Sequence, residues 1–582
     1  MKKCLSLALA VLMLFSIFPI ASADGPALEE RSYPFYIASV EDTTTEPVAV
    51  TFVNGVSDLP YMDLESWAEL VSELFVDGLD LSDYQLAFSS DGSVATLTRE
   101  NGYTMTVDAE KDTISFVDYN SFLRRDSEDT MLIDILSASG FNEEGENSLF
   151  QRNRQASFDR YGKEITISLA DYAIDVFVQD GKFYIPLQTL NDIVLSPACS
   201  LSILFNGEAL FFANAACFVD EETGDTNELY DLYYGVPKRS ISDELAEYNY
   251  NELCLAFDTL YGLKGPHDID SFRQTFWEIG FDEALSSTNT ADSDLAVHQF
   301  LNYYLDDQHS SYLLVSPYSG SDSMDAHEDI ASGTATGIMD EHMLRYMIAR
   351  MLTREDEVPP YEEVGNTAYI TFDDFVFGYD PEEYYASALG EDAPLDDTVG
   401  LIIYAHNQIN REGSPIENVV IDLSNNTGGQ ADAAVFVISW VLCNSYISLK
   451  DTFTGAMSNA VYRADVNLDR KFDADDSILD KNVFCLISPV SFSCGNLVPA
   501  ALKESQIVSL IGTKSGGGSC VVQPMSSATG SLFNISGSHR LSFLKNGSFY
   551  DIDEGVEPDY PIRDIKHYYD RQALTDYING LF

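Results

Sequence analysis

Short segments in which hydrophobic and polar residues alternate fill the chain between residues 34 and 215. Their length and period are those of half-buried β-strands, and turn-forming residues separate them. Val48–Val53, for example, runs into Asn54-Gly55, a dipeptide that favours tight turns. Further strands are predicted over 95–98, 104–108, 113–117, 165–169 and 174–179. The pattern predicts a small mixed α/β module over 34–215.

One pattern occurs twice in this module: a glycine turn, a strand that runs through a proline, and an amphipathic helix. The first copy turns at Asn54-Gly55 and continues into a helix predicted over 64–75. The second turns at Asp180-Gly181 and continues into a helix predicted over 187–194. The repeat is loosely similar to the copper-amine-oxidase-type N-terminal domain, a small binding or stalk module. No histidine precedes His267, so we expect no copper site there.

The hydrophobic period becomes helical between residues 240 and 310, and predicted strands and helices alternate from residue 366 onwards. Apolar strands are predicted over 368–372, 419–423, 482–487 and 507–511, and helices over 399–410, 431–442 and 497–504. Such alternation is typical of a layered α/β domain with a central sheet. We therefore predict a multidomain α+β and α/β chain, with a helical cap segment over 240–365 and an α/β core over 366–582.

The net charge of the chain disfavours two classes of partner, nucleic acids and anionic membranes. The chain has 582 residues, with 94 Asp and Glu against 32 Lys and Arg, and a formal net charge of −62. Phosphate backbones and anionic membrane surfaces attract clustered cations, so we expect no nucleic-acid partner and disfavour docking on a membrane. The 45% of hydrophobic residues can fill cores of ordinary size, so the chain is expected to fold.

The first 23 residues have the pattern of a secretory signal peptide. Lys2 and Lys3 precede an apolar stretch over 5–20, and Ala21-Ser22-Ala23 forms a small-residue cleavage site. The alternative is an uncleaved anchor, although the stretch is short for a spanning helix. We expect cleavage, a secreted or other extracytoplasmic location that includes the cell surface, and no integral membrane span in the mature chain.

Two strand–turn–helix segments of the α/β core carry the candidate chemistry. In the first, strand 420–423 leads through Asn426 to Gly428-Gly429 at a helix N-terminus, where free N–H groups can bind an oxyanion. In the second, Ser491-Phe492-Ser493-Cys494 leads into a helix and exposes a side chain at the helix start. With Gly555-Val556-Glu557-Pro558-Asp559, these segments resemble the C-terminal-processing (tail-specific) serine peptidase family, over residues 240–565.

The resemblance implies a serine peptidase with a crotonase-like core. Ser493, the second serine of the Ser-x-Ser turn, would be the nucleophile, and the amides of Cys494 and of Gly428 or Gly429 would hold the oxyanion. The chain departs from the family at the base. The bacterial tail-specific branch uses a lysine in a Gly-Lys-Gly turn, whereas this chain has Gly517 in that place.

A serine nucleophile needs a base, and His309 in Asp306-Asp307-Gln308-His309 is the candidate. The tricorn-like branch of the family takes a histidine from a comparable helix end, and imidazole has a suitable pKa. Glu557 would orient the imidazole directly or through a hydroxyl, with Asp559 as the alternative. We predict a secreted serine endopeptidase acting on protein or peptide substrates. The alternative is a catalytically inactive extracellular binding protein on a peptidase scaffold.

A second candidate site lies in residues 465–476, which resemble a dockerin-type calcium loop. Its ligands would be the carbonyl of Lys471 and the side chains of Asp465, Asn467, Asp469, Asp473 and Asp476. Arg470 stands where such a loop has glycine, and the alternative is a solvated acidic loop. We predict a structural Ca²⁺ here and no cofactor for the chemistry.

Seven cysteines follow the predicted signal peptide, so at least one thiol is free or is bonded to another chain. Seven are too few for a disulfide scaffold in a chain of this length, so the fold must rest on its cores. Cys494 and Cys520 each follow a turn expected at the active site, and a disulfide or a close contact between them is a hypothesis.

Overall fold

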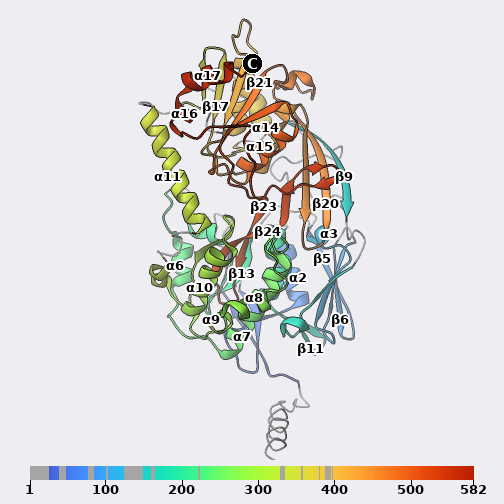
Figure 1. Cartoon of the computed structure of the whole chain (residues 1–582). Coiled ribbons are helices and arrows are strands. Elements are labelled where there is room, and N and C mark those ends of the chain that lie inside the picture. The colour runs from blue at the N-terminus through green and yellow to red at the C-terminus, as the bar shows by residue number, and fades with distance from the viewer. Residues whose placement is uncertain are drawn as a thin grey trace, which may run out of the picture.

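The computed structural model describes residues 25–37, 47–75, 84–99, 102–123, 149–158, 164–220, 223–327, 334–354, 358–378, 381–386, 395 and 397–581. The predicted signal peptide lies outside the described residues. Figure 1 shows the N-terminal strands and the helices that follow them in the lower half, and the α/β core in the upper half. None of the helices within the described ranges is long and apolar enough to cross a membrane.

The two copies of the N-terminal repeat pair with each other in one sheet. The strand order is β1 (Leu28–Tyr33), β3 (Val48–Val53), β4 (Tyr61–Asp63), β12 (Lys182–Pro186) and β11 (Phe177–Gln179). β4 and β12 lie antiparallel at the centre, and each leads directly into its helix, α2 (Leu64–Glu73) or α4 (Leu187–Leu190). The repeated sequence pattern therefore corresponds to two matching halves of one sheet.

Two further sheets complete the N-terminal part. The first is antiparallel, in the order β10 (Ile165–Ser168), β8 (Thr113–Phe116), β7 (Thr104–Asp108), β6 (Val94–Arg99) and β5 (Leu86–Asp91). The second contains β13 (Ser202–Phe205), β14 (Leu210–Ala213) and β2 (Phe35–Ile37). The short helices beside them are α3 (Tyr119–Leu123), α5 (Ser196–Cys199) and α6 (Glu228–Tyr234).

The predicted helical segment follows, with α7 (Asp243–Leu260), α8 (Phe272–Ile279), α9 (Asp282–Leu285), α10 (Thr290–Gln299) and a π-helical turn (Phe300–Leu305). Ser242 caps α7, because its hydroxyl accepts the Leu245 N–H. Leu245 and Leu255 of α7 belong to the same hydrophobic core as the N-terminal strands. The predicted boundary between residues 215 and 240 therefore does not separate two cores.

A mostly parallel sheet forms the centre of the predicted α/β core. Its order is β16 (Tyr361–Val364), β17 (Thr367–Thr371), β18 (Asn418–Asp422), β21 (Asn482–Ile487), β22 (Val508–Gly512) and β27 (Tyr560–Pro561). Only the edge strand β16 is antiparallel to its neighbour. Every residue of β17 and β18 is buried, as expected for parallel strands covered on both faces.

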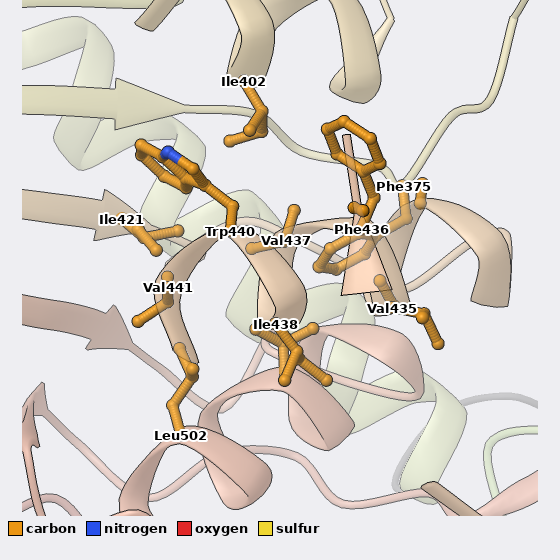
Figure 2. Packing of buried hydrophobic residues seen from close by; sticks show 14 of the residues in the cluster. Phe375, Ile402, Ile421, Val435, Phe436, Val437, Ile438, Trp440, Val441 and Leu502 are labelled. Atoms are coloured by element: carbon orange, nitrogen blue, oxygen red, sulfur yellow. The ribbon is translucent and has the colours of Figure 1, made fainter. Parts of the chain in front are cut away.

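Helices cover both faces of this sheet. One face carries α13 (Thr398–Ile409), α14 (Ala431–Leu442) and α15 (Cys494–Glu504). Figure 2 shows Val441 of α14 between Ile421 of the sheet and Leu502 of α15, and the Trp440 ring of the same helix toward Ile402 of α13. The other face carries α11 (Ala335–Thr353), α16 (Lys566–Tyr569) and α17 (Arg571–Asn579). Because the strands are parallel, the segments that follow β18, β21 and β22 meet at one edge.

A second, antiparallel sheet lies beside the core and was not predicted. Its order is β15 (Ser311–Leu314), β24 (Leu532–Ser542), β19 (Ser445–Asp451), β20 (Ala456–Ala464) and β9 (Phe150–Phe158), with β23 (Cys520–Ser526) also paired to β24. The remaining elements are α12 (Pro381–Ala386), β25 (Leu544–Lys545) and β26 (Ser548–Phe549). β9 pairs with β20 along its whole length, so the N-terminal part contributes a strand to the C-terminal half.

Candidate active site

Ser493 occupies a sharp turn between β21 and α15. Its backbone has φ 55° and ψ −121°, a conformation that residues other than glycine rarely adopt. Its N–H donates to the Gly517 carbonyl at 2.9 Å, and its own carbonyl accepts the N–H groups of Asn496 and Leu497. The half-buried Ser493 Oγ makes no hydrogen bond to any described residue. A strained, fixed backbone that presents a free hydroxyl suits a nucleophile.

The first serine of the Ser-x-Ser turn has a different role. Ser491 is fully buried, and its Oγ donates to the Leu423 carbonyl at 2.6 Å and accepts the Ser488 N–H at 3.0 Å. Ser488 Oγ in turn donates to the Ser424 carbonyl at 2.6 Å. These hydrogen bonds hold the nucleophile turn against the loop that follows β18, so Ser493 alone of the two serines is left for chemistry.

Gly428 and Gly429 bring the loop after β18 against the nucleophile. A Cβ atom on Gly428 would lie 2.7 Å from Cβ and 3.2 Å from Oγ of Ser493, so only glycine allows this approach. The Gly428 N–H is already engaged, because it donates to Asn426 Oδ1 at 3.0 Å. The N–H groups of Gly429 and Cys494 donate no hydrogen bond within the described part of the chain. Of the predicted donors, these two are the pair open to an oxyanion.

His309 lies beside the nucleophile turn. Its ring packs on that of Phe492, the residue before Ser493, with the ring centroids 4.5 Å apart. A Cβ atom on Gly518 would lie 3.1 Å from His309 Cε1. The structure therefore brings together the predicted base and the turn that carries the predicted nucleophile. No hydrogen bond joins the two side chains among the described residues, and such bonds often form only when substrate binds.

The His309 imidazole is buried and has an unused nitrogen. The side chain is 8% exposed, and its Nε2 has no hydrogen-bond partner in the described structure. Burial lowers the pKa of His309, and the charges of Asp307 and Asp553 partly offset this effect. The ring is therefore neutral at pH 7 and able to accept a proton.

Two carboxylates that the sequence analysis missed act on this imidazole. Asp307 Oδ1 accepts the backbone N–H of His309 at 3.1 Å, and Asp307 Oδ2 accepts the Tyr261 hydroxyl at 2.8 Å. Asp553 is held by the N–H and the hydroxyl of Ser519, at 2.9 and 2.8 Å. Asp307 lies two residues before His309 in sequence, a spacing that could have indicated it. Nothing local in the sequence marks Asp553.

Glu557, predicted to orient the imidazole, has no contact with His309 among the described residues. This residue is exposed, and its carboxylate makes no hydrogen bond or ion pair to a described residue. The alternative, Asp559, pairs with Lys503 at 3.2 Å and accepts the Leu510 N–H at 2.9 Å. The reason is the path of the loop: the Asp553 carbonyl accepts the Gly518 N–H, so the beginning of the loop, and not its end, lies at the imidazole.

The position of the lysine base used by the bacterial tail-specific branch is closed by backbone atoms. A Cβ atom on Gly517 would lie 1.9 Å from the Asp553 carbonyl oxygen, and one on Gly518 would lie 2.5 Å from the Phe492 ring. Both glycines also have positive φ, 89° and 81°. No lysine side chain fits at 517, and the nearby Lys514 is exposed. A base for Ser493 must come from another segment.

Comparison with known families agrees with this geometry. Residues 366–562 match the family model described as Peptidase family S41. This segment of the chain is therefore similar to an S41-type peptidase domain. The match includes the Ser493 turn, the Gly428 loop and the closed position 517, whereas His309 lies before it. This similarity supports serine peptidase chemistry.

Three solved structures are similar to the chain. A lipoprotein from Streptococcus agalactiae is 13% identical with a TM-score of 0.34, over 59% of this chain and 98% of that one. The photosystem II D1 C-terminal processing protease is 18% identical with a TM-score of 0.25, over 36% and 47%. The tricorn protease is 10% identical with a TM-score of 0.29, over 85% and 41%. Because these TM-scores are low, no residue's role is taken from them. No curated protein matches the sequence.

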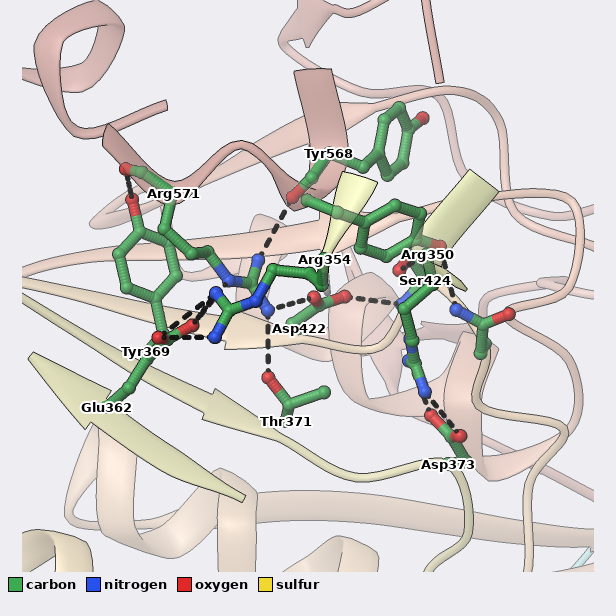
Figure 3. A network of polar contacts seen from close by, with 12 residues as sticks. Arg350, Arg354, Glu362, Tyr369, Thr371, Asp373, Asp422, Ser424, Tyr568 and Arg571 are labelled. Atoms are coloured by element: carbon green, nitrogen blue, oxygen red, sulfur yellow. Dashed lines mark hydrogen bonds and ion pairs between the residues drawn. The ribbon is translucent and has the colours of Figure 1, made fainter. Parts of the chain in front are cut away.

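A buried ion pair between Asp422 and Arg571 anchors the loop after β18 to α17 (Figure 3). This loop carries Gly428 and Gly429 and is called the oxyanion loop below. Asp422, at the end of β18, is fully buried, and its Oδ2 accepts a hydrogen bond from Arg571 of α17 at 2.7 Å. Its Oδ1 accepts the N–H of Ser424, in the loop itself, at 3.0 Å. Burial acts to raise the pKa of Asp422, but Arg571 and Arg350 hold it below its ordinary value. The C-terminal helix thus fixes the start of the loop that carries Gly429.

In the predicted calcium loop, carboxylates accept hydrogen bonds from backbone N–H groups of the same loop. The buried Asp465 accepts the N–H groups of Asp469 and Arg470, and Asp476 accepts those of Val466, Asn467 and Asp473. Arg470 has φ 61°, the conformation for which glycine was expected. Lys471 pairs with the Asp469 carboxylate. In the part of the chain that is described, no group of three or more His, Cys, Asp or Glu is placed to hold a metal ion. The calcium site stays a prediction.

The proposed disulfide between Cys494 and Cys520 is wrong. All seven described cysteines are free thiols. Cys494 Sγ donates to the Gly429 carbonyl at 3.2 Å, whereas Cys520 lies in a hydrophobic core with Phe257 and Phe533. The Cys494 thiol therefore links the two residues whose N–H groups are open to an oxyanion.

Proposed function

We propose that the protein is a secreted serine endopeptidase that uses His309 as its base, like the tricorn-like branch of the family. The observation that carries this proposal is the placement of three groups around one turn. Ser493 presents a free hydroxyl, Gly429 and Cys494 present open N–H groups, and His309 presents a neutral imidazole. The match to Peptidase family S41 supports the serine peptidase chemistry.

The reaction follows from these groups. Ser493 Oγ attacks the peptide carbonyl while His309 accepts the hydroxyl proton. The tetrahedral oxyanion then accepts hydrogen bonds from the N–H groups of Gly429 and Cys494. The imidazolium donates its proton to the leaving amine, and a water molecule repeats the sequence on the acyl-enzyme. Asp307 and Asp553 stabilise the imidazolium, since both act to raise the His309 pKa.

A second candidate is an inactive extracellular binding protein on a peptidase scaffold. Two observations favour it: Gly517 closes the lysine position, and Ser493 and His309 share no hydrogen bond in the described structure. This candidate keeps the fold and the oxyanion loop but transfers no proton from Ser493. It predicts that protein substrates bind and are released uncut.

Digestion of a protein or peptide library by the chain from residue 24 onwards, read by mass spectrometry, distinguishes the two. We expect cleavage at internal bonds by wild type, and a loss of at least about a thousandfold in Ser493→Ala and in His309→Gln. His539→Gln, a histidine on the second sheet, serves as the matched control and should keep its activity. Cleavage that survives in Ser493→Ala overturns the nucleophile assignment. No cleavage by wild type between pH 4 and pH 9 supports the binding protein.

Export and calcium binding are parts of the same proposal. Export predicts that the mature chain begins after residue 23, which N-terminal sequencing of secreted protein checks. A structural Ca²⁺ in the 465–476 loop predicts that CaCl₂ raises the Tm relative to EGTA in wild type but not in Asp469→Ala. Equal Tm values in the two solutions contradict the calcium site. Pairing of the two N-terminal repeat copies is compatible with the binding or stalk role proposed for that part.

A further inference from the structure

Helix α11 lies along one side of the molecule (Figure 1), and it exposes an apolar face. Two rows with i, i+4 spacing make up this face, and each side chain is at least 40% exposed: Met343, Met347 and Met351, and Leu344, Ile348 and Leu352. The opposite face is packed, because Tyr346 is buried in a core with Tyr568. Of the 23 large hydrophobic side chains exposed in the described residues, seven belong to this helix, so they form a patch rather than a scatter.

A groove beside this patch collects positive charge. It is shallow, has a volume of about 410 Å³, and lies between α11 and the segment 563–566. Arg345, Arg563 and Lys566 line it and make no ion pair with any described residue; Asp564 is the single acid in its lining. In a chain with 94 acids and 32 bases, three unpaired cations in one groove reverse the local sign of charge. A second hollow of about 360 Å³ lies on the other side of Arg563, against α17.

We propose that this groove binds an acidic segment of polypeptide that also carries apolar side chains. The three cations would pair with its carboxylates, and the exposed rows of α11 would cover its hydrophobic residues. A second copy of the chain fits less well, because a symmetric contact would bring the same cations together. An anionic bilayer also fits less well, since the net charge of −62 repels it and the cations line a groove between two segments.

The packed face of α11 connects this groove to both catalytic loops. Arg350 pairs with Asp373 at 2.7 Å, and the Asp373 carbonyl accepts the N–H of Thr427, the residue before Gly428. One turn earlier in the helix, Tyr346 Oη lies 3.1 Å from Oγ1 of Thr513, close before the closed glycine turn. A polypeptide held in the groove thus rests on the helix that supports the oxyanion loop. The groove is an exosite for protein substrates, a role that rests on the proposed function.

The test measures binding and cleavage separately. Binding is followed by fluorescence anisotropy on full-length Ser493→Ala protein, which leaves the probe uncut. Three labelled peptides of equal length serve as probes: one of alternating Glu and Leu, one with Lys for Glu, and one with Ser for Leu. The groove variant is Arg345→Glu/Arg563→Glu. Lys111→Glu/Lys182→Glu, in the turn before β8 and at the start of β12, changes the net charge equally and is the matched control.

The Glu–Leu peptide should bind, and the other two should bind at least about tenfold more weakly. The groove variant should raise Kd for the Glu–Leu peptide at least about tenfold, while the control changes it less than about twofold. An unchanged Kd in the groove variant overturns the proposal. So does a dimer in sedimentation velocity that the groove variant abolishes, or preferential binding of phosphatidylglycerol vesicles, because each assigns the surface to another occupant.

The cleavage arm tests the exosite role. In the active protein, the groove variant should raise KM for an acidic protein substrate and leave kcat, and the KM of a short peptide substrate, unchanged. If wild type cleaves nothing, the proposed peptidase function and the exosite role are both rejected. The anisotropy measurement still tests whether the groove binds an acidic peptide. A rise in KM for the short peptide as well contradicts the exosite role, since that peptide does not reach α11.

Discussion

Gly517 and Gly518 have no side chains, and this allows the Asp553 segment and the His309 ring to approach the nucleophile turn. The Asp553 carbonyl would lie 1.9 Å from a Cβ atom on Gly517, inside any van der Waals contact. The same closeness brings the charge of Asp553 to the His309 imidazole. At the residue scale, the close approach of the Asp553 segment therefore does two things: it leaves no space for a lysine at position 517, and it places a carboxylate near the predicted histidine base.

A lysine at position 517, where the bacterial tail-specific branch has its base, should therefore not produce an active enzyme. We expect Gly517→Lys to lose activity and at least about 3 kcal/mol of stability, because the new side chain meets backbone that cannot move away. Gly55→Lys is the control: Gly55 has a similar φ of 83° but no atom within 4 Å of its Cβ position. That variant should lose only about 1–2 kcal/mol, the cost of the left-handed backbone. Urea unfolding measures both, and an active, stable Gly517→Lys contradicts the geometry.

The sequence predicts Ser493 and the Gly428 loop because their chemistry is local to two short motifs. His309 is predicted instead from the resemblance to the tricorn-like branch, which takes a histidine from a comparable helix end. It does not predict which carboxylate reaches His309, because Asp553 and Glu557 are four residues apart and the path of the loop decides between them. Nor does it show that the Gly428 N–H is engaged by Asn426, which depends on a side-chain rotamer.

At the scale of elements, α17 holds the loop after β18 in place through Arg571, although the two segments are distant in sequence. Arg571 is 149 residues from Asp422, yet it neutralises this fully buried carboxylate at the end of β18. A buried charge without a partner is costly, so the loop after β18 depends on the last helix.

Arg571→Met should therefore destabilise the protein by about 3–5 kcal/mol, because Asp422 is left buried and unpaired. Asp422→Asn in the same chain should recover part of the loss. Arg411→Met, which removes an exposed pair with Glu363, is the matched control and should cost no more than about 1 kcal/mol. Chemical denaturation decides the matter, and equal losses in the two single variants would show that the buried pair does not anchor the loop.

Some elements follow from the sequence better than others. Strands β18 and β21 were predicted because they are continuous apolar runs of a parallel sheet. The second sheet was missed because β24 (Leu532–Ser542) and β20 mix small, polar and apolar residues, and their partners are distant in sequence. The pairing of β9 with β20 in particular joins segments about 300 residues apart, which no local pattern indicates.

At the scale of the whole molecule, a pair of buried carboxyl groups joins the N-terminal part to α7. Asp192 lies in a π-helical turn after α4, and Glu252 lies in α7. Each has one oxygen bonded, to Gln188 or to Thr189, and one buried oxygen without a partner. Burial raises the pKa of both groups, that of Glu252 to about 7, and the charge of Glu252 adds to the effect on Asp192.

A carboxyl group whose pKa is raised by folding stabilises the protein when protonated. This contribution is complete below the unfolded pKa of about 4.5 and is lost as pH rises towards 7. Glu252→Gln, which copies the protonated form, should therefore gain on the order of 2 kcal/mol relative to wild type at pH 8 and little at pH 4. Glu247→Gln, on an exposed position of α7, should follow wild type. Parallel stability curves for Glu252→Gln and wild type from pH 4 to pH 8 contradict the raised pKa of Glu252.

The assignment of His309 as base is tested by the pH dependence with which a fluorophosphonate labels the protein, read by intact mass. We predict one adduct, on Ser493. Its rate of formation should rise with pH and reach a plateau, and the midpoint of this rise should lie below pH 6.5, because burial lowers the pKa of His309. His309→Gln should label at least about a thousandfold more slowly. Undiminished labelling of His309→Gln, or no adduct in wild type at any pH from 5 to 9, would contradict it.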